Sequence, residues 1–134
     1  MHEAIQALAA EMARHGTDRD APVRSVMALL GDRWTTLILL VLASGELRHA
    51  ELKRLLATLS AEQAISQRVL TLKLRALERD GFVARRASDD VPPKVSYRLT
   101  TLGMGLHDEA RRMIDWINCH SVAIHDARKG FVAS

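Results

Sequence analysis

Cysteine, proline and aromatic residues are all scarce in this chain of 134 residues. The single cysteine, Cys119, cannot form a disulfide within the chain, which excludes a disulfide-stapled secreted domain. Three prolines and seven glycines are too few for a collagen-like or low-complexity chain. The longest apolar run, residues 37–43, is far shorter than the roughly 18 residues of a membrane span. With 48% hydrophobic residues, the chain is expected to form one compact domain.

Motifs for secretion and for catalysis are also missing. The chain does not begin with a basic segment, an apolar stretch and a small-residue cleavage site, so we expect a cytoplasmic protein with no membrane partner. It has no glycine-rich phosphate loop, nucleophile elbow or HExxH motif. His49 and His107 have no sequence neighbours that would form an acid–base pair, and we expect them to be surface histidines. The chain is therefore not expected to be an enzyme and has no predicted catalytic residue.

A metal site is not expected either. Cys119, His120, His125 and Asp115 are residue types that bind transition metals. However, His120 and His125 are five residues apart, which places them on different faces of a helix, and no CxxC or HxxxH pattern accompanies them. We predict no metal ligand and no cofactor. Cys119 is most simply an inert small hydrophobic residue, and the alternatives are an oxidation switch or a cross-link between two chains near a symmetry axis.

The basic residues are concentrated in the middle of the chain. The formal net charge is only +3, but residues 48–98 hold 11 Lys and Arg against 6 Asp and Glu. A basic segment of this kind favours a polyanionic partner such as nucleic acid. A merely solvated surface would show the same charge, so the order of the predicted elements has to decide between these interpretations.

Apolar residues recur at helical spacing over most of the chain. The pattern predicts helices over residues 3–14, 22–30, 34–42, 49–58 and 66–80, and a long final helix from Thr100 or Thr101 to His125. Asp32 and Ser66 are predicted N-caps. Alternating apolar and polar residues predict two strands, residues 82–86 and 94–99, joined by a turn that contains Pro92-Pro93. The sequence therefore predicts a mainly α fold with a small two-stranded hairpin.

The order helix, turn, helix and hairpin is that of a winged helix-turn-helix, which places its second helix in the major groove of DNA. On that helix Leu70, Leu74 and Leu77 share one face, and the opposite face is polar and cationic. Residues with hydrogen-bond donors on this face and on the hairpin are therefore predicted to bind double-stranded DNA: Ser66, Gln67, Arg68, Thr71, Arg75, Arg86, Lys94 and Arg98. Among them Gln67, Arg68 and Thr71 are expected to contact bases. A protein-interaction module is the alternative function, because winged helices also dock proteins.

Several motifs carry a resemblance to a known family. They are Pro22-Val23, LGDRWT at 30–35, ISQRVLT at 65–71, LRALERDG at 74–81 and VPPKVSYRLT at 91–100. Over residues 22–120 the chain resembles the HxlR-type winged-helix transcriptional regulators of bacteria. The resemblance implies a homodimer that binds a palindromic operator as a repressor or an activator. Some members of this family sense electrophiles, quinones or aldehydes through a cysteine, so the resemblance also implies a possible small-molecule effector.

The chain departs from this family at two places. Ala21 stands where the family often has a cysteine before Pro-Val, so a thiol sensor at that position is excluded. The turn at residues 59–64 is a few residues longer than usual, which changes how the following helix is presented.

The apolar stripes of the first and last helices are expected to be covered by a second copy of the chain. We thus predict an N-terminal dimerisation helix in residues 1–20, a DNA-binding domain in 21–100, a C-terminal dimerisation helix in 101–125 and a flexible tail in 126–134. Trp34 and Trp116 could line a pocket for a small-molecule effector, although packing explains them as well. The predicted dimerisation residues are Ile5, Leu8, Met12, Leu106, Met113, Trp116 and Ile117.

Overall fold

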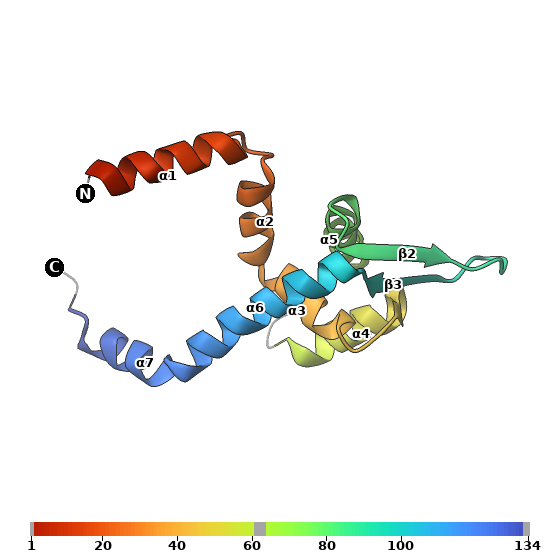
Figure 1. Ribbon diagram of the computed structural model, residues 1–134. Helices are drawn as coiled ribbons and strands as arrows, with labels where there is room; N and C mark the ends of the chain where they lie inside the picture. The colour runs from red at the N-terminus through yellow and green to blue at the C-terminus, as the bar shows by residue number, and fades with distance from the viewer. Residues whose placement is uncertain (1, 61–63, 133–134) are drawn as a thin grey trace. The chain divides into compact units, whose positions relative to one another are not determined.

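The computed structural model describes residues 2–60 and 64–132. Its elements divide into two parts, one before and one after residue 36, and each part is described by itself. In chain order (Figure 1) the elements are α1 (His2–His15), α2 (Pro22–Leu30), α3 (Arg33–Leu42), β1 (Leu47–Arg48), α4 (His49–Leu59), α5 (Gln67–Arg79), β2 (Val83–Ala87), β3 (Val95–Leu99), α6 (Thr101–Cys119) and α7 (Ser121–Gly130). The predicted mainly helical fold with a small antiparallel sheet is confirmed.

Three helices begin where their N-caps predict. The side-chain oxygens of Asp32, Ser66 and Thr100 each accept a hydrogen bond from the backbone N–H three residues further on, at 2.8, 3.1 and 3.0 Å. Such a cap satisfies one of the backbone donors that the first turn of a helix leaves without a partner. The predicted turn at residues 59–64 includes residues 61–63, which lie outside the described residues.

The core of the second part is built from leucines of three helices. The predicted buried stripe of α5, Leu70, Leu74 and Leu77, is fully buried, as expected. Further fully buried side chains come from α3 and α4: Ile38, Leu39, Leu42, Leu52 and Leu56. Because one face of α5 is fixed in this core, its opposite face is turned outward.

The sheet has three strands rather than the two that were predicted. β2 and β3 form the hairpin, with Arg85 opposite Tyr97 and Arg86 opposite Ser96. The additional strand, β1, pairs with the other edge of β3, which gives the order β1-β3-β2. A strand of two residues has no periodicity in the sequence, and only its partner strand defines it. We call β2, β3 and the turn between them, residues 83–99, the wing.

The C-terminal helix differs from its prediction in two ways. It is broken at His120 into α6 and α7, and α7 continues to Gly130, so the predicted tail at 126–134 begins too early. At the break the backbone N–H and the Nδ1 atom of His120 both contact the carbonyl oxygen of Trp116, at 3.1 and 2.7 Å. The two rings also stack, with centroids 4.2 Å apart. No glycine or proline marks this break, and the sequence pattern therefore continued through it.

In the first part, Pro22 occupies the first turn of α2, as predicted. The Arg24 guanidinium donates a hydrogen bond to the backbone oxygen of Thr17 at 2.7 Å, which fastens the linker between α1 and α2. No single helix among the described residues is long and apolar enough to cross a membrane. The consecutive helices α2 and α3, bent by 84°, pass that test of length and composition only as a pair.

A close approach between α6 and the wing requires glycine at position 103. A Cβ atom placed on Gly103 would collide with the backbone carbonyl of Phe82, the residue before β2. The Thr100 hydroxyl, next to α6, also donates a hydrogen bond to the backbone oxygen of Gly81 at 2.6 Å. The start of α6 is thus fixed against the chain that enters the wing.

We expect Gly103→Ala to lower the free energy of unfolding by at least about 2 kcal/mol, because the new methyl group overpacks a contact made by backbone atoms. Gly105→Ala is the matched control, two residues further along the same helix. A Cβ atom there meets nothing within 4 Å. This variant should gain roughly 0.5–1 kcal/mol from the better helix propensity of alanine. Urea unfolding measures both, and an equal effect of the two substitutions would contradict the packing.

Candidate nucleic-acid interface

The outward face of α5 carries the predicted polar residues. Gln67, Arg68 and Arg75 are exposed, Thr71 is half-buried, and Ser66 is the exposed N-cap. The predicted helix faces are therefore present in the structure, with polar side chains turned away from the leucine core.

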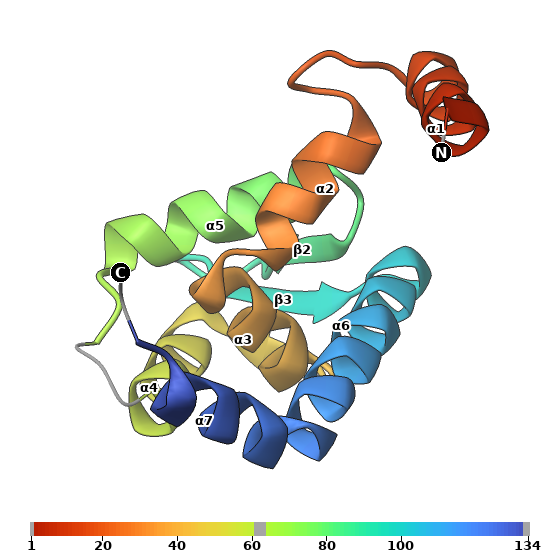
Figure 2. The ribbon, with the colours of Figure 1, turned by 90° about the vertical axis from the view of Figure 1, so that its left-hand side faces the viewer.

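An open groove runs between α5 and the wing. α5 lies alongside β2 in both ribbon views (Figure 1, Figure 2). The groove has a volume of about 1220 Å³, and the beginning of α4 contributes to its wall. Of the predicted DNA-binding residues it is lined by Gln67, Thr71, Arg75 and Lys94. Arg68 lies next to it, in a smaller hollow on the same face of α5.

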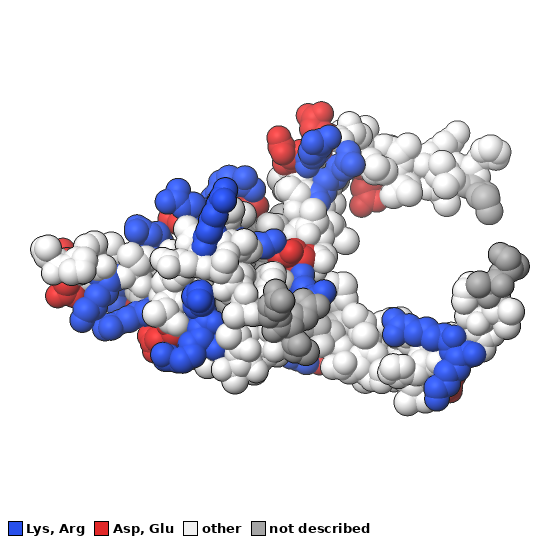
Figure 3. Space-filling view, turned by 180° about the vertical axis from the view of Figure 1, so that it is seen from behind, with Lys and Arg blue, Asp and Glu red and all other residues white. Residues whose placement is uncertain are grey.

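Positive charge dominates the lining of this groove. Among the described residues its only carboxylate is that of Glu78, whereas its cations come from four segments: Arg48, Arg75, Arg79, Arg85 and Lys94. Lys and Arg side chains also gather over the region that carries α5 and the wing (Figure 3). A cleft lined by charge of one sign concentrates ligands of the opposite sign. The groove is therefore suited to a polyanion.

The two faces of the wing carry different arginines. Residues directly opposite each other in an antiparallel pair share a face. Arg85 is opposite the buried Tyr97 and lines the groove, whereas Arg86 and Arg98 belong to the other face of the sheet. Of the three predicted wing cations, the structure therefore brings only Lys94 into the groove.

Arg86 has a partner on this other face. Its guanidinium donates a hydrogen bond to the carboxylate of Glu46, just before β1, at 2.5 Å. An exposed ion pair of this kind contributes little stability, on the order of 0–1 kcal/mol. The contact fixes the direction of the Arg86 side chain.

His49, the first residue of α4 and expected to be a surface histidine, is half-buried and lines the groove. Its Nε2 atom is 3.1 Å from the hydroxyl oxygen of Thr71 on α5. Its ring also lies against that of Tyr97 on β3, with centroids 6.2 Å apart. Burial lowers the pKa of His49 below its ordinary value of 6.5, and the nearby charge of Lys53 lowers it further.

Sequence reasoning missed several groove residues. Arg48, His49 and Leu72 gave no signal, because their role depends on how α4 and the wing pack against α5. Arg85 had a partial signal, since the period of two along residues 83–87 separates it from Arg86. Leu72 is 57% exposed on α5, next to Thr71.

The predicted dimerisation residues form exposed apolar stripes on two helices. All are exposed except Leu106, which is half-buried within its own chain and is less available to a partner than we expected. The residues of α1 are Ile5, Leu8 and Met12, and those of α6 are Met113, Trp116 and Ile117.

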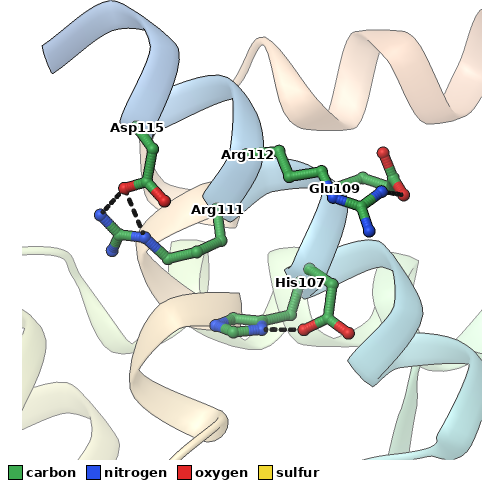
Figure 4. Close-up of polar contacts among 6 residues, drawn as sticks. His107, Glu109, Arg111, Arg112 and Asp115 are labelled. Carbon is green, nitrogen blue, oxygen red and sulfur yellow. Dashed lines mark hydrogen bonds and ion pairs between the residues drawn. The ribbon is translucent and has the colours of Figure 1, made fainter. Parts of the chain in front are cut away.

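Two ion pairs stabilise α6 (Figure 4). Arg111 pairs with Asp115 at 2.7 Å, and Arg112 pairs with Glu109 at 2.6 Å. These pairs join residues one helical turn apart, a spacing that stabilises a helix by about 0.2–0.5 kcal/mol per pair. Because Glu109 precedes Met113 by one turn, only the pair of Arg111 and Asp115 lies on the side of α6 opposite the apolar stripe.

Cys119 is a free, exposed thiol at the end of α6. Within residues 2–60 and 64–132, no three His, Cys, Asp or Glu side chains are grouped so that they could hold a metal ion.

Comparison with known proteins identifies relatives of this chain. The profile of the HxlR-like helix-turn-helix family matches residues 29–124. The uncharacterized HTH-type transcriptional regulator YdeP of Bacillus subtilis is 39% identical over 95 residues, which cover 71% of this chain and 70% of YdeP. The corresponding regulator YtfH of Escherichia coli is 36% identical over 110 residues, which cover 80% of this chain and 82% of YtfH.

Solved structures show the same fold. A transcriptional regulator, YtfH of Salmonella typhimurium, superimposes with a TM-score of 0.68 at 33% identity. The superposition covers 84% of this chain and 95% of that one.

The N-cap of α5 provides a test of what stabilises this wall of the groove. Ser66→Ala removes the oxygen that accepts the Val69 N–H and is expected to cost about 1 kcal/mol of unfolding free energy. Ser66→Asp keeps an acceptor and adds a negative charge at the positive end of the helix, so it should retain the stability. Urea unfolding of the two variants checks this, and an equal loss in both would show that the cap does not stabilise α5.

Proposed function

Since the chain belongs to the HxlR-like helix-turn-helix family of transcriptional regulators, we propose that it binds double-stranded DNA sequence-specifically as a homodimer. In this proposal it acts in the cytoplasm, on a palindromic operator. The observation that carries the proposal is the cationic groove between α5 and the wing, whose α5 wall has exposed donors above a buried leucine stripe.

α5 is the recognition helix in this proposal. The major groove of DNA is about 12 Å wide and admits one α-helix. Arg68 and Gln67, in the first turn of α5, have the side chains that pair with guanine and adenine edges. Thr71 and Ser66 contact a base or a phosphate from the same face, and Arg75 lies one turn further along, where it meets the backbone.

The wing contributes contacts to phosphates. Lys94 and Arg85 line the groove and therefore face the DNA backbone beside the recognition helix. Arg86 and Arg98 are proposed as phosphate contacts from the other face of the sheet. Such contacts bind any sequence and make affinity depend on salt, because each neutralised phosphate releases condensed counterions.

The apolar stripes of α1 and α6 are proposed as the dimer interface. A stripe that contains an exposed tryptophan and several exposed aliphatic side chains is unfavourable in water, and a second copy of the chain covers it. Two recognition helices related by a two-fold axis require half-sites about one helical turn apart, roughly 34 Å. Binding of a small-molecule effector stays a prediction.

Because base contacts are assigned to α5 and phosphate contacts to the wing, the proposal predicts different effects of two substitutions. Arg68→Ala should cost about 1–3 kcal/mol on a duplex selected from random DNA, and it should relax the preference at one base position. Lys94→Ala should weaken binding to all duplexes alike and flatten the slope of log affinity against log salt by about 0.9 per lost phosphate contact. Fluorescence anisotropy at several salt concentrations measures both.

Arg111→Ala is the control for these two variants, because Arg111 lies on α6 outside the groove, pairs with Asp115 and is on the side of the helix opposite Met113 and Ile117. It should leave affinity and salt slope unchanged. If wild-type protein selects no common sequence and elutes from a DNA column without salt dependence, the proposal is wrong and a protein-docking module is favoured.

The dimer interface is tested by Ile117→Asp, which places a charge in the apolar stripe of α6. We expect the wild-type chain to be a dimer by light scattering and this variant to be a monomer with much weaker DNA binding. The matched control is Val132→Asp, because Val132 is an apolar residue that is 86% exposed beyond α7, outside the wing and the stripe of α6. A monomeric wild-type chain would refute the interface.

A further inference from the structure

We propose that His49 is a positioning residue that takes up a proton when the groove binds DNA, and that the protonated form leaves the Thr71 hydroxyl free to donate a hydrogen bond to the DNA. This inference rests on the proposed function of the groove. It adds a residue and a proton to that function, and it makes DNA binding dependent on pH.

The position of His49 links three of the elements that form the groove, α4, α5 and β3. It is the first residue of α4, its Nε2 atom is 3.1 Å from Thr71 on the recognition helix, and its ring lies against Tyr97 of β3. Both His49 and Thr71 line the groove. A change at His49 is therefore transmitted directly to a side chain on the proposed DNA-contacting face.

The hydroxyl of Thr71 has one proton to donate and two lone pairs. While Nε2 of a neutral His49 is an acceptor, that proton is used within the protein and only lone pairs of Thr71 face the groove. Protonation makes both ring nitrogens donors. Nε2–H then donates to Thr71, so the hydroxyl proton is free for a phosphate oxygen or a base acceptor.

The charges around His49 favour the neutral form in the free protein. On its own element it has Glu51 and Lys53, and Arg48 directly precedes it. From the other walls of the groove come, among titratable and charged groups, Arg75, Glu78 and Arg79 of α5, Arg85 of β2, Lys94 before β3, and Tyr97 of β3. Apart from Glu51, Glu78 and Tyr97, these groups are cations, and the Glu51 carboxylate accepts a hydrogen bond from the backbone N–H of Arg48 at 3.1 Å.

Binding of DNA instead favours the protonated form of His49. Phosphates in the groove are anions, so they favour the charged imidazolium and raise the pKa of His49 in the complex. In the free protein, burial and then Lys53 hold this pKa below 6.5. Between the two values, binding takes up a proton and affinity rises as pH falls. Below the lower value His49 is already protonated without DNA, and the affinity levels off.

The experiment measures proton uptake directly. Wild-type protein is titrated with a duplex of mixed sequence at low salt, and with the duplex that it selects from random DNA, by calorimetry at pH 6.5 in buffers of different ionisation enthalpy. We expect uptake of up to one proton per protomer. Affinity should accordingly rise by up to about tenfold for each pH unit within the window.

Variants assign the proton to its residue. His49→Gln keeps a hydrogen-bonding side chain that cannot titrate, and it should abolish the uptake. His125→Gln, an exposed histidine of α7, is the matched control and should leave uptake unchanged. Thr71→Val removes the hydroxyl at nearly constant shape, so the total gain in affinity between about pH 8 and about pH 5 should be smaller.

A second measurement does not depend on any variant being folded. Histidine ring-proton NMR of the wild-type chain, with and without the mixed-sequence duplex, should show one histidine with a pKa that is low in the free protein and raised in the complex. Salt-dependent binding without such a change, or with uptake that His49→Gln retains, would overturn the inference and leave the proposed function intact. Failure to bind either duplex at any salt concentration would overturn both.

Discussion

The burial of one face of α5 is the constraint on which the rest of the structure depends. Leu70, Leu74 and Leu77 are fully buried, and a helix whose leucines are fixed in a core cannot turn about its own axis. Burying a leucine side chain stabilises the fold by about 1.5–3 kcal/mol. This is more than a single hydrogen bond made within the protein by the polar face of α5 contributes. The exposure of Gln67, Arg68 and Arg75 is therefore a consequence of hydrophobic packing on the opposite side of the same helix.

The helices and their starting points could be predicted because their signals are local. Asp32, Ser66 and Thr100 each satisfy a backbone donor only three residues away, so the sequence alone contains the whole interaction. β1 could not be predicted in the same way, because it is a strand only by its pairing with β3. The break at His120 likewise depends on a ring that stacks on Trp116 and on a side-chain nitrogen that contacts its carbonyl, which a hydrophobic pattern does not record.

The residues of the candidate site also fall into two groups, those with a local signal in the sequence and those placed by packing between elements. Its α5 residues follow from the helical period. Lys94 was predicted as a hairpin cation, but strand alternation would place it on the face of Arg98, and it reaches the groove because β3 begins only at Val95. The positions of His49 and Arg85 depend instead on distances between elements, namely the approach of α4 to α5 and the register of β2 against β3. His49 has no sequence neighbour that would form an acid–base pair and was thus expected on the surface, and tertiary packing placed it, half-buried, in a wall that three elements share.

The strand order β1-β3-β2 leaves the outer edge of β2 without a partner strand within the described chain. Free edges expose backbone donors and acceptors that can recruit a strand from another molecule, and charged side chains on the edge oppose such pairing. β2 carries the consecutive residues Arg85 and Arg86 at its centre, one on each face of the sheet. Two copies that approached edge to edge would bring four guanidinium groups together, a repulsion that opposes pairing of the wings.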